Sequence, residues 1–460
     1  MHLPSSIASL IYLSVVAYLF RRDFREKPNV TAALWLPISW VFFSGTRFIS
    51  QWMGLFGLNF GGVNLEEGSP VDAVYFFAVI LVGLWVLGRR RVQLAEFVRR
   101  NRWVTIYLAY CLVAVVWSDF SLVAFKRWTK LLGQPVMVLI VLTEPDPREA
   151  VVRLFKRLAY VVIPVSVLFI KYFPEWGRTY DLWTGFPANC GITPDKNILG
   201  FDCFILGYFF FWHFLGVWQA EKSRARRNEL ILCGAFLATI FWLMHMAQSS
   251  TPFVSFLVAM VITLALGLKS FKKEALTVYV AVIIAVGVIA EFGFHASGLV
   301  IEMLGKDPTL TGRTDIWKIL VHWDINPVLG TGFESFWLGE RREKLWDMFP
   351  VLFLNSAHNG YLETYLCLGL AGLFITLGMV FSTYARARRE LFRDFEFARF
   401  RLSYLVVFLI YNWTEVGFRT HSVPFFGFFL VAIEYPWAGA VSSWHPLAAQ
   451  KPPAEADYEF

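Results

Sequence analysis

Apolar runs close to the length of a membrane span recur along almost the whole chain, and they set its predicted architecture. A helix needs roughly 17–25 such residues to cross the hydrocarbon core of a bilayer. Helices are expected because a helix satisfies its backbone hydrogen bonds within one segment. The pattern predicts an all-α polytopic membrane protein with about 12–13 transmembrane helices in one domain, residues 1–440. The thirteen runs are residues 5–20, 31–49, 70–88, 103–118, 131–144, 158–174, 198–216, 229–246, 252–268, 275–293, 358–382, 402–417 and 424–440.

The first run has a second interpretation, which is a cleaved signal peptide. A signal peptide carries its basic residues before its apolar run. Here the charged stretch RRDFREK, residues 21–27, follows the run instead. We therefore expect residues 5–20 to be retained as a span.

Composition supports this architecture and gives it a direction. Of the 460 residues, 57% are hydrophobic, which a water-soluble surface does not accommodate. With the N-terminus outside, the predicted inner segments carry 28 Lys and Arg and the outer segments 13. Because inner loops are enriched in basic residues, this orientation is favoured, and it also accounts for the net charge of +7. The tail, residues 441–460, is then cytoplasmic, and its Pro-containing acidic composition predicts disorder.

The longest outer segment, about residues 294–357, is predicted to be a periplasmic loop that contains short helices and caps the active site. Apolar residues recur at helical spacing after Thr314, which predicts a helix of about ten residues there. Arg313 directly precedes this helix. Free backbone N–H groups, the helix dipole and a guanidinium at one place suit an anion such as phosphate. The alternative is that Arg313 reaches lipid headgroups or a local carboxylate.

His358 holds the matching position at the start of a long apolar run. The dipole at a helix N-terminus disfavours a charged imidazole, and a neutral imidazole serves as a general base. Glu363 follows within about one turn, as a candidate to orient His358 or to bind a sugar hydroxyl. The alternative is a histidine that hydrogen-bonds lipid headgroups. We predict that Arg313 and His358 face one site just outside the bilayer.

Further polar residues lie at the outer ends of other spans and complete the candidate site. Ionisable groups within or beside spans are costly, and by default they mark functional or paired positions. Salt bridges between helices are the alternative. The candidates for binding a pyrophosphate or a sugar are Lys196, Arg178, Asn197, Asn359, Glu363, Arg419 and Glu415.

Motifs of soluble enzymes are missing from the sequence. It contains no GxxxxGK[ST] loop, HExxH, CxxC or GxSxG pattern, and its five cysteines lack metal-ligand spacing. No predicted inner loop is long enough for a nucleotide-binding domain. We therefore expect no metal, no cofactor, no nucleic-acid partner and a substrate that arrives already activated. A lipid-linked diphosphate sugar meets that need, because its diphosphate leaves readily once cations bind it.

The residues around Arg313 and His358 are similar to a conserved region of the O-antigen ligase and polymerase superfamily. The resemblance rests on GRTDIW, NPVLGTGF and AHNGYLETYLCLGLAG within residues 312–372. The segment KDPTLTGRTDIW, residues 306–317, is most similar to exopolysaccharide polymerases of the succinoglycan type. DKNILG, residues 195–200, resembles a second block of the same superfamily.

This resemblance implies a metal-independent, inverting glycosyltransferase with a GT-C-like helical fold in the bacterial inner membrane. It implies that His358 activates the acceptor hydroxyl and that Arg313 binds the donor's pyrophosphate. The chain departs from the ligases at Thr251, where a second phosphate-binding arginine is usual. The candidates for this second cation are, in order, Lys196, Arg178 and Arg419.

The favoured hypothesis is a polymerase that joins undecaprenyl-diphosphate-linked oligosaccharide repeats at the periplasmic face, for an exopolysaccharide or O-antigen. Its partners are a lipid-linked donor, a glycan acceptor and membrane lipid, with a chain-length regulator as a candidate protein partner. One alternative is a ligase that transfers lipid-linked glycan to lipid A core or another acceptor. Another is a transporter or flippase for a polysaccharide intermediate, although the sequence shows no paired broken helices of the kind such proteins carry.

Overall fold

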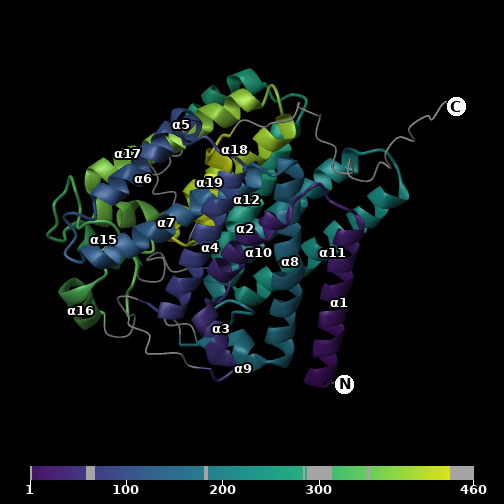
Figure 1. Cartoon of the computed structure of the whole chain (residues 1–460), viewed down its shortest axis with the longest axis horizontal. Helices are drawn as coiled ribbons and strands as arrows, with labels where there is room; N and C mark the ends of the chain where they lie inside the picture. Colours follow the sequence, from purple (N-terminus) through teal and green to yellow (C-terminus); the bar gives the residue numbers. More distant parts are fainter. Residues whose placement is uncertain are drawn as a thin grey trace.

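The chain folds into a bundle of α-helices, which the computed structural model describes for residues 3–58, 68–180, 185–282, 285–286, 313–349 and 353–435 (Figure 1). Five of the described helices are long and apolar enough to cross a membrane, and a bent helix pair raises that number to six. The protein is therefore an all-α polytopic membrane protein, as its hydrophobic pattern predicts.

Long helices form the body of the bundle, and shorter elements connect them. The long helices are α1 (Ser5–Arg25), α4 (Pro70–Arg89), α7 (Ser121–Leu142), α8 (Pro147–Tyr172), α10 (Lys196–Gln219), α11 (Arg224–Ala247), α12 (Ser250–Gly267), α17 (Gly360–Glu390) and α18 (Phe395–Thr414). The shorter elements are η1 (Ala32–Leu34), α2 (Trp35–Gly45), α3 (Ile49–Leu55), α5 (Leu94–Arg100), α6 (Arg102–Val113), α9 (Pro174–Gly177), β1 (Arg178–Tyr180), β2 (Pro187–Asn189), η2 (Lys273–Ala275), α15 (Arg313–Val321), α16 (Gly339–Met348) and α19 (Val423–Ala432).

Most predicted spans coincide with a described helix, although the helix ends differ by several residues on both predicted sides of the membrane. The run at 31–49 is broken, because α2 and α3 meet at an angle of 64°. The run at 131–144 belongs to a longer helix, α7, which begins at Ser121. Much of the predicted span 275–293, part of the loop 294–357 and the tail 441–460 lie outside the described residues.

Helix α10 lies at the centre of the bundle. Of its apolar window, 78% is buried, compared with 33% for α4, α11 and α12. Helices α8, α11 and α12 pack against α10. By contrast, α4 exposes large apolar side chains such as Val74, Phe77 and Trp85. An apolar face of this kind is suited to lipid, whereas a helix that is apolar all round belongs in the interior.

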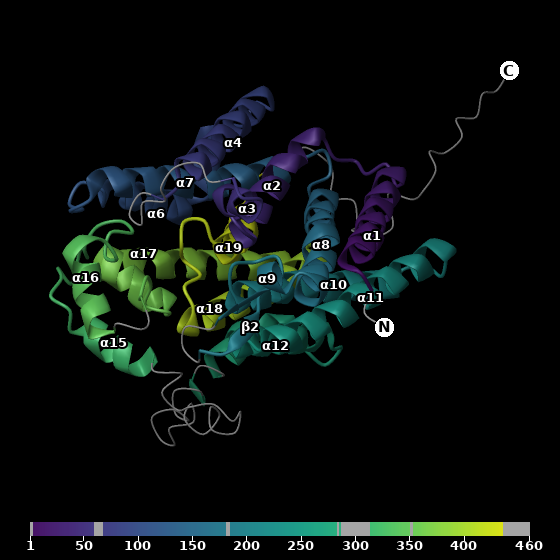
Figure 2. The same cartoon turned by 90° about the horizontal axis from the view of Figure 1, so that it is seen from below.

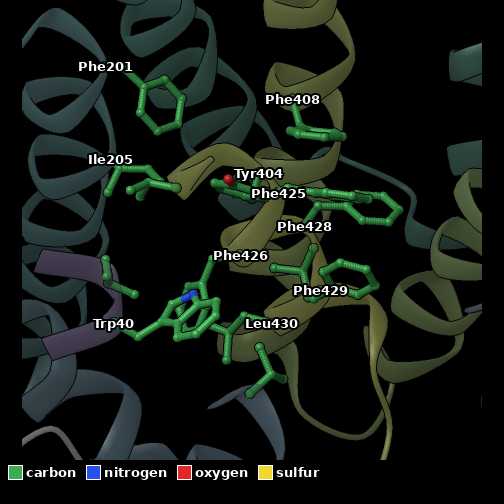
Figure 3. Close-up of a cluster of buried hydrophobic side chains, with 14 of the residues drawn as sticks. Trp40, Phe201, Ile205, Tyr404, Phe408, Phe425, Phe426, Phe428, Phe429 and Leu430 are labelled. Carbon is green, nitrogen blue, oxygen red and sulfur yellow. The ribbon is translucent and has the colours of Figure 1, made fainter. Parts of the chain in front are cut away.

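Aromatic side chains fill the core where α18 and α19 meet α10 (Figure 3). Every residue of α19 is buried. The Phe408 and Phe428 rings lie 4.9 Å apart, and the Tyr404 hydroxyl donates a 2.8 Å hydrogen bond to the carbonyl of Pro424. Gly427 permits this approach, since a Cβ there would lie 2.2 Å from the Tyr404 hydroxyl oxygen. The packing fixes α19 and therefore the chain just before it, residues 415–422.

Ion pairs join four helices at the end of the bundle that the charge bias assigns to the cytoplasm. Glu229 on α11 lies 2.5 Å from Lys156 on α8 and 2.5 Å from Arg22 on α1. It also lies 3.0 Å from His213 on α10. Cys233 comes within 4.8 Å of the ligand atoms of His213 and Glu229. Because two cations already neutralise Glu229, we interpret this cluster as a structural network.

Short elements gather at the opposite end. Helix α15 packs against α17, and Figure 2 shows α16 next to α15. The short helix predicted from Thr314 is α15, and the charged stretch after Trp337 forms α16. The polar segment 171–197 contains an antiparallel two-stranded sheet, in which Arg178 pairs with Asn189 and Tyr180 with Pro187.

Candidate active site

A cavity of about 660 Å³ lies at the end of the bundle that the charge bias assigns to the outside. Five separate parts of the chain enclose it: the break between α2 and α3, the two-stranded sheet, the start of α10, the segment before α17, and residues 411–424. Charged and polar side chains from these parts lie together on its wall. They include Asp195, Lys196, Asn197, His358, Glu415, Arg419 and His421.

The carboxylate of Glu415 joins the two residues that the sequence places at helix starts. Its Oε1 accepts a 2.9 Å hydrogen bond from the Arg313 guanidinium, and its Oε2 lies 3.5 Å from His358 Nδ1. Arg313 also donates to the backbone carbonyl of Thr414, the last residue of α18. Burial opposes the ionisation of Glu415, but Arg313 and His358 outweigh it, and the pKa of Glu415 falls below its ordinary value. Glu415 is therefore a carboxylate at neutral pH.

His358 is held in an uncommon backbone conformation. Its φ of +46° lies in the left-handed region, where a non-glycine residue costs of order 1–3 kcal/mol. The residues on either side of it are fixed. Glu363 accepts a 2.8 Å hydrogen bond from the Ala357 N–H, and Asn359 caps α17 by accepting from the N–H groups of Tyr361 and Leu362. This geometry holds the imidazole at the cavity wall.

Gly360 docks the start of α17 on the end of α18. Its N–H donates a 3.1 Å hydrogen bond to the backbone carbonyl of Glu415. A Cβ at Gly360 would lie 1.9 Å from Asn412 Oδ1. The fully buried Asn412 side chain is itself engaged, because its Oδ1 accepts from the N–H of Gly417 at 2.9 Å. The close approach therefore sets the spacing between His358 and Glu415.

We predict that Gly360→Ala lowers turnover by about 10-fold or more and destabilises the fold by about 1–3 kcal/mol, because the new methyl group overpacks this contact. Thermal unfolding and turnover of the purified variant measure the two effects. Gly234→Ala is the matched control, since a Cβ at Gly234 meets nothing within 4 Å. Wild-type turnover by Gly360→Ala would contradict the positioning role of this contact.

The start of α10 contributes a second group of cavity residues. Asp195 caps the helix by accepting from the N–H groups of Asn197 and Ile198, and burial raises the pKa of Asp195. Lys196, the first residue of α10, lines the cavity. The Asn197 Oδ1 accepts a 2.9 Å hydrogen bond from Ser249. This start of α10 therefore places a cation and a helix N-terminus at the cavity.

Thr251 lies beside the same site, although it is not a cation. Its hydroxyl oxygen lies 2.9 Å from that of Thr414, the residue whose carbonyl accepts from Arg313. Thr251, where the chain departs from the ligase pattern, therefore lies close to the Glu415 carboxylate that joins Arg313 and His358.

A basic corner forms where residues 418–422 meet α7. Arg419 and His421 line the cavity. Burial lowers the pKa of His421 well below its ordinary value, and Arg419, Lys130 and Arg127 lower it further, so His421 is neutral. Glu334 supports the same segment by accepting hydrogen bonds from the N–H and hydroxyl of Thr420. Positive charge is therefore concentrated on this side of the cavity.

Four of the predicted site residues do not line the cavity. Arg178 is exposed, and its guanidinium donates a 3.4 Å hydrogen bond to the carbonyl of Ile170. Asn359 is a helix cap, and Glu363 accepts from Ala357 and from the Trp337 indole at 2.7 Å. Arg313 reaches the site through Glu415. By contrast, Lys196, Asn197, His358, Glu415 and Arg419 line the cavity directly.

The break between α2 and α3 supplies wall residues that the hydrophobic pattern does not identify. Ser44, Thr46 and Gln51 line the cavity from this region. We predicted one uninterrupted span at residues 31–49, so these residues fell at its end or outside it. The sequence feature that could have indicated the break is Gly45–Arg47, a glycine and two polar residues that interrupt the apolar run.

The region that carries Arg313 and His358 is similar to known proteins. Residues 234–377 match the family model described as O-antigen ligase. The chain is also 26% identical over 312 residues to the exopolysaccharide production protein ExoQ of Rhizobium meliloti (strain 1021), a match that covers 64% of this chain and 66% of that protein. The resemblance to the O-antigen ligase and polymerase superfamily is thereby confirmed. Glu415, Lys196 and Arg419 lie outside the part matched by the family model.

Proposed function

We propose that this relative of the O-antigen ligases and polymerases is a membrane glycosyltransferase that polymerises undecaprenyl-diphosphate-linked oligosaccharide repeats. We place the reaction at the periplasmic face of the bacterial inner membrane. The observation that carries the proposal is the Glu415 carboxylate, which contacts both Arg313 and His358 beside a cavity lined by cations. The name of the similar protein, which refers to exopolysaccharide production, supports a polymer as the product.

In the proposed reaction, His358 is the general base. With Nδ1–H directed to Glu415, Nε2 is the nitrogen that accepts the proton of the acceptor hydroxyl. The acceptor oxygen attacks the anomeric carbon of the donor sugar, and the bond from that carbon to the phosphate oxygen breaks. The electron pair leaves with the lipid diphosphate. A single displacement of this kind inverts the anomeric configuration, and its steps need no metal.

Lys196 and Arg419 are the cations that we assign to the donor diphosphate. Both line the cavity, whereas Arg313 does not line it and contacts Glu415 and Thr414 instead. Two cations on the wall match a group with two phosphates better than one arginine does. Arg313 then acts on the reaction by fixing Glu415.

We predict that Lys196→Ala and Arg419→Ala each raise KM for the lipid-linked donor by about 10–100-fold, the effect of losing one charge-assisted hydrogen bond. Both variants are also expected to lose sensitivity to inorganic diphosphate as a competing inhibitor. Lys318→Ala, whose side chain is 76% exposed on α15, is the control. Unchanged KM and unchanged inhibition in Lys196→Ala and Arg419→Ala would remove both residues from the diphosphate site.

The decisive experiment gives purified protein a lipid-linked repeat isolated from a strain that lacks this protein. The polymerase hypothesis predicts longer lipid-linked chains as products. Transfer only to an added lipid A core supports the ligase alternative, which the O-antigen ligase match keeps open. If the donor is consumed by neither route, the proposed glycosyl transfer is overturned and the transporter hypothesis remains.

A further inference from the structure

The inner end of the cavity contains a buried carboxyl group that the proposed mechanism does not use. Asp202 lies on α10 two turns beyond Asp195, about 10 Å further along the helix axis. It is 5% exposed and lines the cavity. Its Oδ2 has no hydrogen-bond partner among the described residues. The hydroxyl of Ser44, which lines the same cavity from the end of α2, also lacks a partner there.

Polar groups in this position favour a ligand that donates hydrogen bonds. A buried polar group without a partner loses its hydrogen bonds to water, so a ligand that supplies a partner recovers that loss. The surrounding wall is aromatic and apolar: the Phe201 and Tyr411 rings, which both line the cavity, lie 4.8 Å apart. An isoprenoid chain placed here would leave Asp202 and Ser44 unsatisfied. The lipid tail therefore belongs elsewhere.

The two ends of the cavity differ in charge, and this difference sorts the parts of a substrate. Lys196 and Arg419 supply positive charge and suit phosphates, as proposed above. When ionised, Asp202 supplies only acceptor atoms and repels phosphate. A group with many hydroxyl donors and no negative charge fits the inner end. A sugar ring has that chemistry.

We propose that Asp202 and Ser44 form a sugar-binding subsite, in which hydroxyls of a glycan donate to Asp202 and exchange a hydrogen bond with Ser44, beside Phe201 and Tyr411. This subsite rests on the proposed function for the identity of the glycan. Gly45 completes it by allowing close packing, since a Cβ there would lie 3.1 Å from Asp202 Oδ1.

The test measures binding apart from turnover. The probe is a mixture of oligosaccharides released by partial acid hydrolysis of the host's own exopolysaccharide, added to the full chain in a sugar-free detergent. We expect saturable binding to the wild type, at least about 10-fold weaker binding to Asp202→Leu, and an intermediate loss in Asp202→Asn and Ser44→Ala. Ser255→Ala is the matched control, because the Ser255 hydroxyl is also buried and lacks a partner within the described part of the chain, but it does not line the cavity.

Each outcome decides the proposal. Wild-type affinity in Asp202→Leu, or no saturable binding to the wild type, overturns the subsite. Weaker binding at an unchanged melting temperature supports it, because a purely structural carboxyl would change stability and leave binding alone. Turnover of the lipid-linked repeat by the same preparation tests the glycosyltransferase separately, so binding without turnover overturns only the proposed reaction.

The same preparation distinguishes the two sources of the sugar. If the released oligosaccharide is itself elongated from the lipid-linked donor, the subsite holds the acceptor glycan. If it only competes with the donor, the subsite holds the donor glycan. Both outcomes support a sugar at Asp202.

Discussion

Replacing His358 by alanine is expected to lower turnover of the lipid-linked repeat by about 10²–10⁴-fold, the usual contribution of a positioned general base. In cells, polymer is then expected to disappear and single lipid-linked repeats to accumulate at a normal protein level. The physical reason is that the imidazole takes up the acceptor proton. The other imidazole on the described wall, that of His421, forms no hydrogen bond or ion pair with Glu415.

The backbone at His358 calls for a second variant. Its positive φ is tolerated better by asparagine than by most residues, so His358→Asn preserves the local conformation while removing the base. His322→Ala serves as the control, because His322 is an exposed histidine just beyond α15. Product chain length and accumulated intermediates are read by gel and by mass spectrometry. Normal polymer from His358→Asn would show that His358 is not the base.

The pairing of Arg313 with His358 was predictable only in part. Both residues stand at the start of a helical pattern beside a polar segment, and the structure brings them to one carboxylate. The identity of that carboxylate was not predictable, since Glu415 is separated from Arg313 by 102 positions. Local spacing suggests Glu363 as the group that orients His358. In the first turn of α17, however, the Glu363 side chain points back to the Ala357 N–H.

Tertiary contacts, which local sequence patterns do not contain, decide which of the predicted phosphate-binding cations line the cavity. Lys196 lies at a helix start and lines the cavity, as its position suggests. Arg178 lies in the same polar segment, but pairing of β1 with β2 leaves it exposed. Arg419 reaches the cavity because the buried α19 fixes the segment before it. The angle between α2 and α3 depends on packing in the same way, and the hydropathy of residues 31–49 does not reveal it.

Replacing Glu415 by glutamine is expected to lower kcat by about 100-fold with little change in KM. Glutamine has nearly the same shape, so packing and the substrate wall are kept. It lacks the negative charge that stabilises His358 once the imidazole has taken the acceptor proton, an interaction made only as the reaction proceeds. A loss confined to kcat is the signature of such an interaction. Glu340→Gln, an exposed carboxylate on α16, is the control.

A double variant separates this role from a general loss of structure. If Glu415 acts through His358, then His358→Asn combined with Glu415→Gln is expected to be no slower than His358→Asn alone, because residues that act as a unit are not additive. Independent, multiplying losses would contradict the pairing.

The pH dependence of stability gives a second check. The pKa of Glu415 is lowered in the folded protein, so the stability that the Glu415 carboxylate contributes is complete above its ordinary pKa of 4.5. This contribution is lost as the pH falls through the lowered pKa. The difference in melting temperature between the wild type and Glu415→Gln is therefore expected to shrink as the pH falls below about 4.5.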